Sequence, residues 1–376
     1  MKKILVLGAT GSIGKSGLDI IKHHPDKFCL VGMSAHKNAE TLLKISKEFG
    51  CKNLCLTSNN VPHFDGISLY GAEGLKELIE SSDCDIVLNG IAGAAGLEPS
   101  ILALENNKNL ALANKETIVM AGLLIKKLAQ KNKSLILPVD SEHSAIFSLV
   151  QKYGVESLDS IILTASGGPF RNTPKNELEF VTLADTLKHP TWNMGQKITI
   201  DSATLANKGL EVIEACRLFD VSASKVHVVV HPQSLVHSLI RTKDGMLYAQ
   251  ISEPDMKHPI IQAFSWPDFL SNKLKLFDLT ANIEMSFQKP RFDDFKMLPL
   301  AYEAAEKSGC YTIAYNAANE VAVEAFIKNQ IKFLDIPHLT QDVLSKDWTA
   351  EPAGFNEVFD ADKEARFVAK SILSKF

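Results

Sequence analysis

The sequence has few cysteines, and none of them has the spacing of a metal site or a disulfide framework. The six are Cys29, Cys51, Cys55, Cys84, Cys216 and Cys310. Cys51 and Cys55 are four residues apart, but no second pair of ligands follows them, so a zinc site is not indicated. Isolated thiols are typical of a reducing compartment, and we therefore expect a cytoplasmic protein.

The sequence also lacks a charge excess and a long apolar run. Lysine and arginine number 40 and aspartate and glutamate 44, which gives a net charge of −4. Nucleic-acid-binding proteins usually carry a strong basic excess, so we expect no nucleic-acid partner. No apolar stretch is long enough to span a bilayer, so we expect no membrane partner. The first apolar run, residues 4–7, leads directly into glycine, which predicts a strand rather than a signal peptide.

Short apolar runs alternate with helical patterns over residues 1–140. This rhythm is typical of a parallel α/β sheet with helices between the strands. The predicted strands are Lys3–Leu7, Cys29–Ser34, Asn53–Leu56, Ile86–Asn89, Asn109–Ala113 and Leu135–Val139. We therefore predict an α/β fold that begins with a Rossmann-like nucleotide-binding domain over residues 1–140.

The pattern changes after residue 140, and 376 residues are enough for two or three domains. Residues 141–275 read as a central α+β catalytic domain with one strong helix at 208–219. Its segment 167–195 is long and has little periodicity, which is typical of a mobile lid loop. The strands predicted in this domain are 161–164, 198–200, 226–230, 238–241 and 247–251.

The last part of the chain contains several prolines and then helical patterns. Residues 276–297 read as a connector and residues 298–376 as a small C-terminal helical domain. The helices predicted there are 298–307, 314–329 and 360–373.

Three glycines after the first predicted strand indicate a nucleotide site. Gly8, Gly11 and Gly14 have the spacing G-x-x-G-x-x-G and precede a helical pattern. Such glycines permit a tight turn and a close approach of the backbone, and a helix N-terminus attracts a pyrophosphate. The alternative is a turn with a purely structural role.

The end of the second predicted strand indicates which nucleotide is bound. NAD sites usually carry an acid about 20 residues after the glycine turn, and the segment 34–38 has none. Lys37 lies there instead, and a cation suits the 2′-phosphate of NADP. The alternative is that Lys37 is a solvated loop charge.

Polar residues follow the predicted strands that end near Ala113 and Val139. Asn114, Lys115 and Glu116 come after the first of them, and Asp140 and Glu142 after the second. In an extended segment residues i and i+2 point to the same side, so Asp140 and Glu142 can aim two carboxylates at one point beyond the strand. Like charges so close raise a pKa unless a cation or a shared proton offsets them, and because hydride transfer alone needs no acidic pair, we predict a divalent metal.

A helix start farther along supplies a possible third metal ligand and an anion site. Ser202, Asn207 and Lys208 lie near the start of the predicted helix, where an anion such as a phosphate is favoured. Glu211 lies one turn farther on. Its apolar neighbours leave open that it is an ordinary residue at the edge of the helix.

Several segments together resemble the 1-deoxy-D-xylulose 5-phosphate reductoisomerase family, in its order and spacing and over essentially the whole chain. The most specific are L-A-N-K-E at 112–116, V-D-S-E-H-S-A-I-F at 139–147 and N-K-G-L-E at 207–211. The others are 8–14, 165–170 and 316–326. The resemblance implies an enzyme of the non-mevalonate isoprenoid route that uses NADPH and a divalent metal (Mg, Mn or Co) to convert 1-deoxy-D-xylulose 5-phosphate into 2-C-methyl-D-erythritol 4-phosphate. It also implies a homodimer.

The resemblance also implies residue roles. The metal ligands would be Asp140, Glu142 and Glu211, and the catalytic residues Lys115, Glu142 and His189. The substrate would contact Lys115, Ser141, Glu142, Ser166, His189, Trp192, Ser202, Asn207, Lys208 and Glu211, with Ser166, Ser202, Asn207 and Lys208 around its phosphate. NADPH would contact Gly8, Thr10, Gly11, Ser12, Ile13, His36, Lys37, Asn38, Asn114, Glu116 and Gly195. His189 and Trp192 would belong to a closing lid, although packing for Trp192 and solvation for His189 are the alternatives.

Three positions depart from the family pattern. His36 stands where glycine is common, Ala206 where a larger apolar residue is common, and Pro290-Arg291 where Pro-Asp is usual. None is a proposed metal ligand, so only cofactor detail and connector geometry are affected. Two other functions remain open from the residues alone: a metal-dependent oxidative decarboxylase or simple sugar-phosphate dehydrogenase, and an NADP-sensing protein without catalysis.

Overall fold

The computed structural model describes residues 1–192 and 194–375 of the chain. Asn193, in the predicted lid, lies outside the described residues. The chain divides into two compact units, which are described one at a time. Unit 1 comprises residues 1–117, 125–144 and 255–274, and unit 2 comprises residues 118–124, 145–254 and 275–376.

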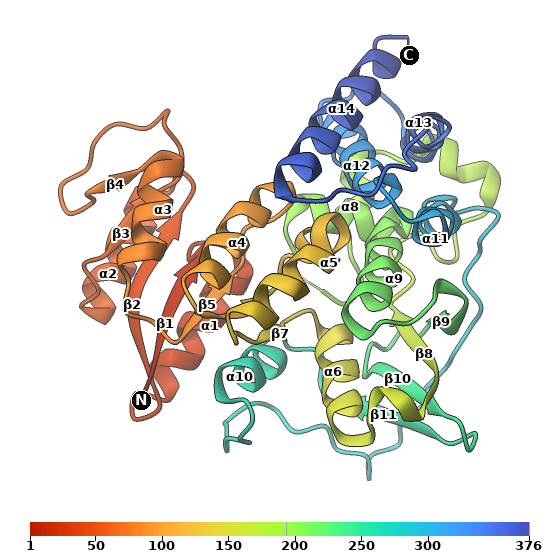
Figure 1. The fold of residues 1–376 in the computed structure, drawn as a ribbon. Helices are drawn as coiled ribbons and strands as arrows, with labels where there is room; N and C mark the ends of the chain where they lie inside the picture. The colour runs from red at the N-terminus through yellow and green to blue at the C-terminus, as the bar shows by residue number, and fades with distance from the viewer. Residues whose placement is uncertain (193, 376) are drawn as a thin grey trace. The chain divides into compact units, whose positions relative to one another are not determined.

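Unit 1 contains a parallel sheet of seven strands in the order β4-β3-β2-β1-β5-β6-β7. In Figure 1 several of its strands are drawn in red and orange. The strand order reverses between β1 and β5, and ligands of open α/β sheets bind beyond the carboxyl ends of the strands at such a point. The strands are β1 (Lys2–Leu7), β2 (Phe28–Ala35), β3 (Leu54–Leu56), β4 (Leu69–Tyr70), β5 (Ile86–Asn89), β6 (Asn109–Leu112) and β7 (Ile136–Pro138).

Helices connect these strands and cover the sheet. All four residues of β5 are buried, which explains its apolar run Ile86-Val87-Leu88 before Asn89. Helix α1 packs against β1, β2 and α10, whereas α3 packs against α4. The elements are α1 (Ser12–His23), α2 (Ala39–Phe49), α3 (Gly71–Ser81), η1 (Ala94–Gly96), α4 (Leu97–Glu105), α5 (Lys115–Lys131), α6 (Ser141–Tyr153) and α10 (Lys257–Ser265), of which α5 and α6 also contribute residues to unit 2.

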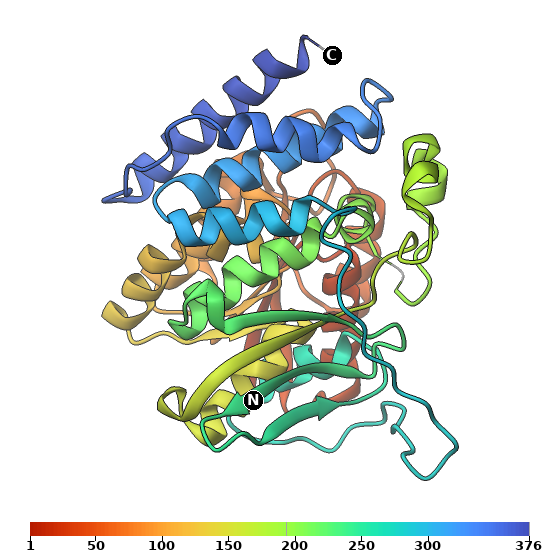
Figure 2. The ribbon, with the colours of Figure 1, turned by 90° about the vertical axis from the view of Figure 1, so that its right-hand side faces the viewer.

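Unit 2 contains a mixed sheet of four strands in the order β11-β10-β8-β9. Strand β8 pairs in parallel with β9 and antiparallel with β10, which in turn pairs with β11. Helix α9 packs on β8 and β9, as Figure 2 shows. The elements are η2 (Val155–Ser157), β8 (Leu158–Ala165), η3 (Lys175–Phe180), α7 (Leu183–Thr186), α8 (Gln196–Thr204), α9 (Ala206–Phe219), η4 (Ala223–Lys225), β9 (Val226–Val230), β10 (Val236–Thr242) and β11 (Leu247–Ile251).

Four helices at the end of the chain complete unit 2. They are α11 (Met297–Lys307), α12 (Tyr311–Ile327), α13 (Asp335–Leu344) and α14 (Phe355–Leu373). Helix α12 packs against the other three and is buried on nearly all sides. Three of these helices match the prediction within a few residues, but α13 was missed. The predicted domain boundaries at 140, 275 and 297 stay a prediction.

Two local predictions were wrong. Residues 198–200, predicted as a strand, lie in the middle of helix α8. Their β-branched side chains favour strands, but Thr199 and Ile200 are buried on one side of this helix, so packing outweighs the preference. The chain is also not extended through Glu142, because β7 ends at Pro138 and α6 begins at Ser141.

Candidate active site

The glycine turn lies at the carboxyl end of β1 and packs tightly. Gly8 has a φ of +77°, and a Cβ at Gly14 would lie 2.4 Å from the carbonyl oxygen of Gly8. Only glycine therefore fits at these two positions. Gly11 is the N-cap of α1 and makes no side-chain cap, so the first turn of the helix offers its amides at the surface. This small-residue turn at a helix start fits a pyrophosphate.

The predicted cofactor contacts after β2 lie in an exposed turn. The ring of His36 forms a hydrogen bond through Nδ1 to Oγ1 of Thr57 at 3.0 Å, and Lys37 is exposed beside it. The Asn38 side chain accepts a hydrogen bond from the amide of Thr41 and begins α2. A cationic, acid-free turn at this strand end fits the 2′-phosphate of NADPH.

Asp140 is held by a lysine and by its own helix. Lys115, at the start of α5, donates a hydrogen bond from Nζ to Oδ2 of Asp140 at 2.7 Å. The other oxygen, Oδ1, accepts hydrogen bonds from the backbone amides of Glu142 and His143 at 3.2 and 3.4 Å. Asp140 thus acts as the cap of α6, which is the physical reason why the strand does not continue. Both side chains of the ion pair are largely buried.

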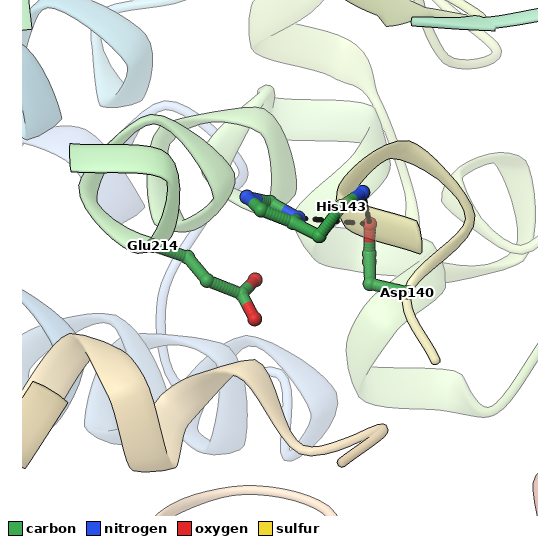
Figure 3. Close-up of side chains that lie close together, drawn as sticks. All are labelled: Asp140, His143 and Glu214. Carbon is green, nitrogen blue, oxygen red and sulfur yellow. Dashed lines mark hydrogen bonds and ion pairs between the residues drawn. The ribbon is translucent and has the colours of Figure 1, made fainter. Parts of the chain in front are cut away.

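The first turn of α6 carries two more predicted site residues. The hydroxyl of Ser141 donates a hydrogen bond to Oε2 of Glu142 at 2.6 Å. His143 is fully buried and forms a hydrogen bond through Nδ1 to Oδ1 of Asp140 at 3.1 Å, drawn as a dashed line in Figure 3. Because a carboxylate only accepts, the proton of this bond lies on Nδ1 of His143.

In unit 2, Glu211 is held by residues one turn before it on α9. Lys208 donates a hydrogen bond from Nζ to Oε2 of Glu211 and another to the backbone carbonyl of Thr164. Asn207 donates a hydrogen bond to Oε1 of Glu211 at 2.5 Å. These residues share one face of the helix because they lie three and four positions apart. Glu211 and Lys208 are both buried, so Glu211 is not an ordinary residue at the edge of the helix.

The predicted phosphate residues Ser166 and Ser202 are linked by a glycine turn. Gly167 and Gly168 follow β8 with φ values of +82° and +68°. A Cβ at Gly168 would lie 2.6 Å from the carbonyl oxygen of Ser202 on α8, so the turn packs directly on that helix. The amide of Gly168 donates a hydrogen bond to Oγ of Ser166 at 3.3 Å.

His189 contacts Ser166 and fixes the turn that follows it. Its Nε2 lies 3.0 Å from Oγ of Ser166, while Nδ1 accepts hydrogen bonds from the amides of Thr191 and Trp192 at 3.2 and 2.9 Å. The proton of the neutral ring therefore lies on Nε2. Burial lowers the pKa of His189 to about 4, with a smaller effect from the positive charge of Arg171. Trp192 is half-buried, and Gly195 is the exposed N-cap of α8.

Two supporting contacts were not predicted from the sequence. Asp201, buried on α8, accepts hydrogen bonds from Lys197 at 2.7 Å and from Asn319 of α12 at 2.8 Å. Asn319 lies 118 positions away, so no local pattern could show the pair. Arg291, one of the departures from the family pattern, donates hydrogen bonds to the carbonyls of Phe170, Arg171 and Thr173 and so fixes the start of the predicted lid.

Two buried side chains able to bind a metal also escaped the sequence analysis. They are His143, three residues after Asp140 on α6, and Glu214, three residues after Glu211 on α9, both drawn in Figure 3. The signal that could have found them is the spacing of one helical turn from each predicted ligand. Asp140, Glu142 and His143 belong to unit 1, and Glu211 and Glu214 belong to unit 2. The three ligands predicted from the sequence, Asp140, Glu142 and Glu211, all offer oxygen atoms, which magnesium prefers.

Three family models match the chain in consecutive order. The model for 1-deoxy-D-xylulose 5-phosphate reductoisomerase matches residues 4–122, and the model for its C-terminal domain matches residues 136–219. A further model, the DXP reductoisomerase C-terminal domain, matches residues 251–368.

Relatives match over the full length. A protein of Treponema denticola named 1-deoxy-D-xylulose 5-phosphate reductoisomerase is 49% identical over 371 residues, which are 98% of this chain and 96% of that protein. The protein of the same name from Treponema pallidum is 43% identical and covers 100% of this chain and 98% of its own.

Solved structures with the same fold contain a cofactor and a metal. A DOX-P reductoisomerase in complex with NADPH, fosmidomycin and magnesium is 36% identical, with a TM-score of 0.91 and coverage of 100% of this chain and 98% of its own. The enzyme of Zymomonas mobilis in complex with NADPH is also 36% identical, with a TM-score of 0.90 and full coverage of both chains.

Proposed function

The chain belongs to the 1-deoxy-D-xylulose 5-phosphate reductoisomerase family, and from this premise we propose which of its residues carry out the reaction. The protein is an NADPH- and divalent-metal-dependent enzyme that converts 1-deoxy-D-xylulose 5-phosphate to 2-C-methyl-D-erythritol 4-phosphate in the non-mevalonate isoprenoid route. The observation that carries this assignment is the 49% identity over nearly the whole chain.

Asp140, Glu142 and Glu211 are the proposed metal ligands. Three carboxylates are a donor set that magnesium and manganese prefer. Asp140 and Glu211 each form an ion pair with a lysine in the structure. A bound metal ion would add its positive charge to that of the lysine or displace the lysine from the carboxylate. When bound, the metal would polarise neighbouring substrate oxygens, and NADPH would supply the hydride.

The substrate's backbone oxygens would be bound by Lys115, Ser141 and Glu142. The Lys115 ammonium lies at the carboxyl end of the parallel sheet, where it can stabilise negative charge that develops on a substrate oxygen. Its bond to Asp140 fixes its direction. Ser141 is one residue from Asp140 on the same helix turn, which supports a role beside the metal ligands.

The substrate's phosphate would be bound by Ser166, Ser202, Asn207 and Lys208. The glycine turn that packs on the carbonyl of Ser202 supports this group, because it brings the chain after Ser166 directly against Ser202. His189, already in contact with Ser166, and Trp192 would cover the substrate as a lid that excludes water.

The cofactor would lie along the turns that follow β1, β2 and β6, with Gly195 at its other end. The residues proposed to contact NADPH are Gly8, Thr10, Gly11, Ser12, Ile13, His36, Lys37, Asn38, Glu116 and Gly195; Asn114 belongs to the same proposed site. The absence of an acid from segment 34–38 and the exposed Lys37 support NADPH over NADH.

A homodimer in the cytoplasm is also proposed. Strand β11 lies at the edge of its sheet and exposes Leu247 and Ile251, at 47% and 42%, which suits a second copy of the chain. Sedimentation of the purified protein tests this, and a monomer at micromolar concentration would contradict it. All six cysteines are free thiols, which supports a reducing compartment. Among the described residues, no helix has the length and apolar character to cross a bilayer.

A coupled assay tests the function directly. The purified protein is mixed with NADPH and 1-deoxy-D-xylulose 5-phosphate, with magnesium or with a chelator, and NADPH absorbance is followed. We expect NADPH oxidation only with metal, and a product with the rearranged carbon skeleton by mass spectrometry and NMR. Oxidation without skeletal rearrangement would instead indicate a simple dehydrogenase.

A further inference from the structure

The side chain of Asn114 has no hydrogen-bonding capacity left for a ligand. It is 2% exposed. Its Nδ2 donates to the carbonyls of Ile91 and Gly93 at 2.7 and 2.8 Å and lies 3.1 Å from Oε2 of Glu116. Its Oδ1 accepts from the amide and the hydroxyl of Thr117 at 2.9 and 2.6 Å. An amide has two donor hydrogens and two acceptor lone pairs, and all four are used.

A second buried amide holds the same loop from β5. The Asn89 side chain is fully buried and donates hydrogen bonds to the carbonyl of Gly96 and to the hydroxyl of Ser100, both at 2.8 Å. Its Oδ1 accepts a hydrogen bond from the amide of Ile91 at 3.1 Å. Between them, Asn89 and Asn114 bind three carbonyls and one amide of the loop 90–96.

This loop lies where a sheet of this topology binds its ligand. It follows β5, which neighbours β1 at the point where the strand order reverses. A Cβ at Gly8 would lie 3.0 Å from the carbonyl oxygen of Gly90, so the loop directly contacts the glycine turn. The glycine turn and the loop 90–96 therefore both lie at the switch point of the sheet, where ligands of such folds bind.

We propose that Asn114 is a positioning residue for the cofactor: its side chain holds the loop 90–96 in its binding shape and does not itself contact NADPH. The inference rests on the proposed function and revises the role that the sequence suggested for Asn114. The loop consists largely of glycine and alanine, which have no polar side chains to fix it. Its shape depends on the buried amides beneath it.

The same side chain is also the N-cap of α5, and one substitution separates the two roles. Asn114→Ser keeps a side-chain oxygen able to cap the helix, because serine and asparagine are equally good caps. Its hydroxyl is too short to reach the carbonyls of Ile91 and Gly93. Asn114→Asp likewise keeps the cap and removes the donor. Asn132→Ala is the matched control, because Asn132 at the other end of α5 also donates to a carbonyl, that of Leu104 at 2.8 Å.

Two readouts test the proposal on the full-length protein. Hydrogen–deuterium exchange measures how firmly the amides of residues 90–96 are held without cofactor, and fluorescence titration measures the Kd for NADPH. For Asn114→Ser we expect both the exchange rate and the Kd to rise about tenfold, the effect of losing one or two hydrogen bonds. Asn114→Asp should show at least the same rise, and the KM for NADPH should change more than kcat. Asn132→Ala should leave the loop exchange and the Kd as in the wild type.

Three outcomes would overturn the proposal. If Asn114→Ser and Asn114→Asp lose affinity while the loop exchanges at the wild-type rate, the side chain contacts the cofactor directly. If both bind NADPH like the wild type, the loop needs no such support. If Asn132→Ala changes both readouts equally, the effect is a general loss of stability. Failure of the wild type to bind NADPH would instead contradict the proposed function.

Discussion

Each unit holds one buried lysine–carboxylate pair of the proposed site, but the two pairs are built differently. Lys115 and Asp140 lie 25 positions apart and follow the neighbouring strands β6 and β7. Lys208 and Glu211 lie three positions apart on one helix. The first pair is therefore made by the sheet, and the second by the periodicity of a single helix.

The groups around the two carboxylates differ in the same way. Asp140 also accepts hydrogen bonds from two backbone amides and from the ring of His143. Glu211 accepts a hydrogen bond from the side chain of Asn207. Lys208, which contacts Glu211, also donates a hydrogen bond to the carbonyl of Thr164. Backbone donors stay in place when side chains are replaced. We infer that the charge of Asp140 is compensated more robustly than that of Glu211.

The largest expected effect concerns the carboxylates themselves. In Asp140→Asn and Glu211→Gln, one metal ligand is lost. One side-chain oxygen remains as an acceptor, but the new amide nitrogen cannot accept the hydrogen bond of the neighbouring lysine. We expect kcat/KM to fall by about 10²–10³, because metal catalysis is worth several kcal/mol. Turnover against magnesium concentration is the measurement. Because Asn is also a good cap, Asp140→Asn should keep the start of α6, while the loss of the buried ion pair with Lys115 lowers its thermal stability.

Glu214→Gln is the control for these variants. Glu214 is a buried carboxylate one turn after Glu211 on α9, and it is not a proposed metal ligand. If Glu214→Gln lowers turnover as much as Glu211→Gln, the all-oxygen set is not the metal site.

A smaller effect is expected on the free energy of unfolding, which should fall by different amounts when Lys208 and Lys115 are replaced. Lys208→Met removes the ammonium that contacts the buried Glu211, and breaking a buried pair costs roughly 3–5 kcal/mol. Lys115→Met should cost less, about 1–3 kcal/mol, because Asp140 keeps its amides and His143. Chemical denaturation without metal measures both. Magnesium should restore part of the loss, about 2.7 kcal/mol at a hundred times its Kd.

An exposed pair serves as the control. Lys307 and Glu303 form a surface ion pair at 2.7 Å, so Lys307→Met should leave the free energy of unfolding nearly unchanged. Equal losses in Lys115→Met and Lys208→Met would show that the backbone donors around Asp140 contribute little, and the comparison between the units would fail.

The same difference determines how much the sequence could predict. The contacts among Asn207, Lys208 and Glu211 follow from helix spacing, and the helix 208–219 was predicted within two residues. Lys115 and Asp140 were both expected at strand ends, because parallel strands end at one edge of the sheet. Their direct contact was not predicted, since it depends on the register of β6 and β7.

Other features depended on packing that local patterns do not encode. Asp140 and Glu142 were expected in an extended chain, but Asp140 caps a helix whose start lies directly after it. A capping aspartate was visible in Asp140-Ser141-Glu142-His143, and the apolar run before it favoured the strand interpretation. Helix α8 and the Asp201–Asn319 contact both depend on burial against distant segments.

The smallest expected effect concerns the protonation of His143 and His189. His143 carries its proton on Nδ1 and His189 on Nε2, so long-range ¹H–¹⁵N spectra at neutral pH should show opposite tautomers. The pKa of His189 is lowered from 6.5 to about 4, so the fold favours the neutral ring. As the pH falls from 6.5, the unfolded chain binds this proton before the folded protein does. The stability that His189 contributes is therefore full above about pH 6.5 and is lost as the pH falls toward 4.

Arg171→Gln tests the cause of that shift. Burial is the larger cause and Arg171 the smaller, so an NMR titration should give a His189 midpoint only modestly above 4 and still well below 6.5. A midpoint restored to 6.5 would make the arginine the main cause. If His189 of the wild type titrated near 6.5, or carried its proton on Nδ1, the turn formed by Thr191 and Trp192 would not be fixed by this ring, and the two histidines would not differ as the hydrogen bonds require.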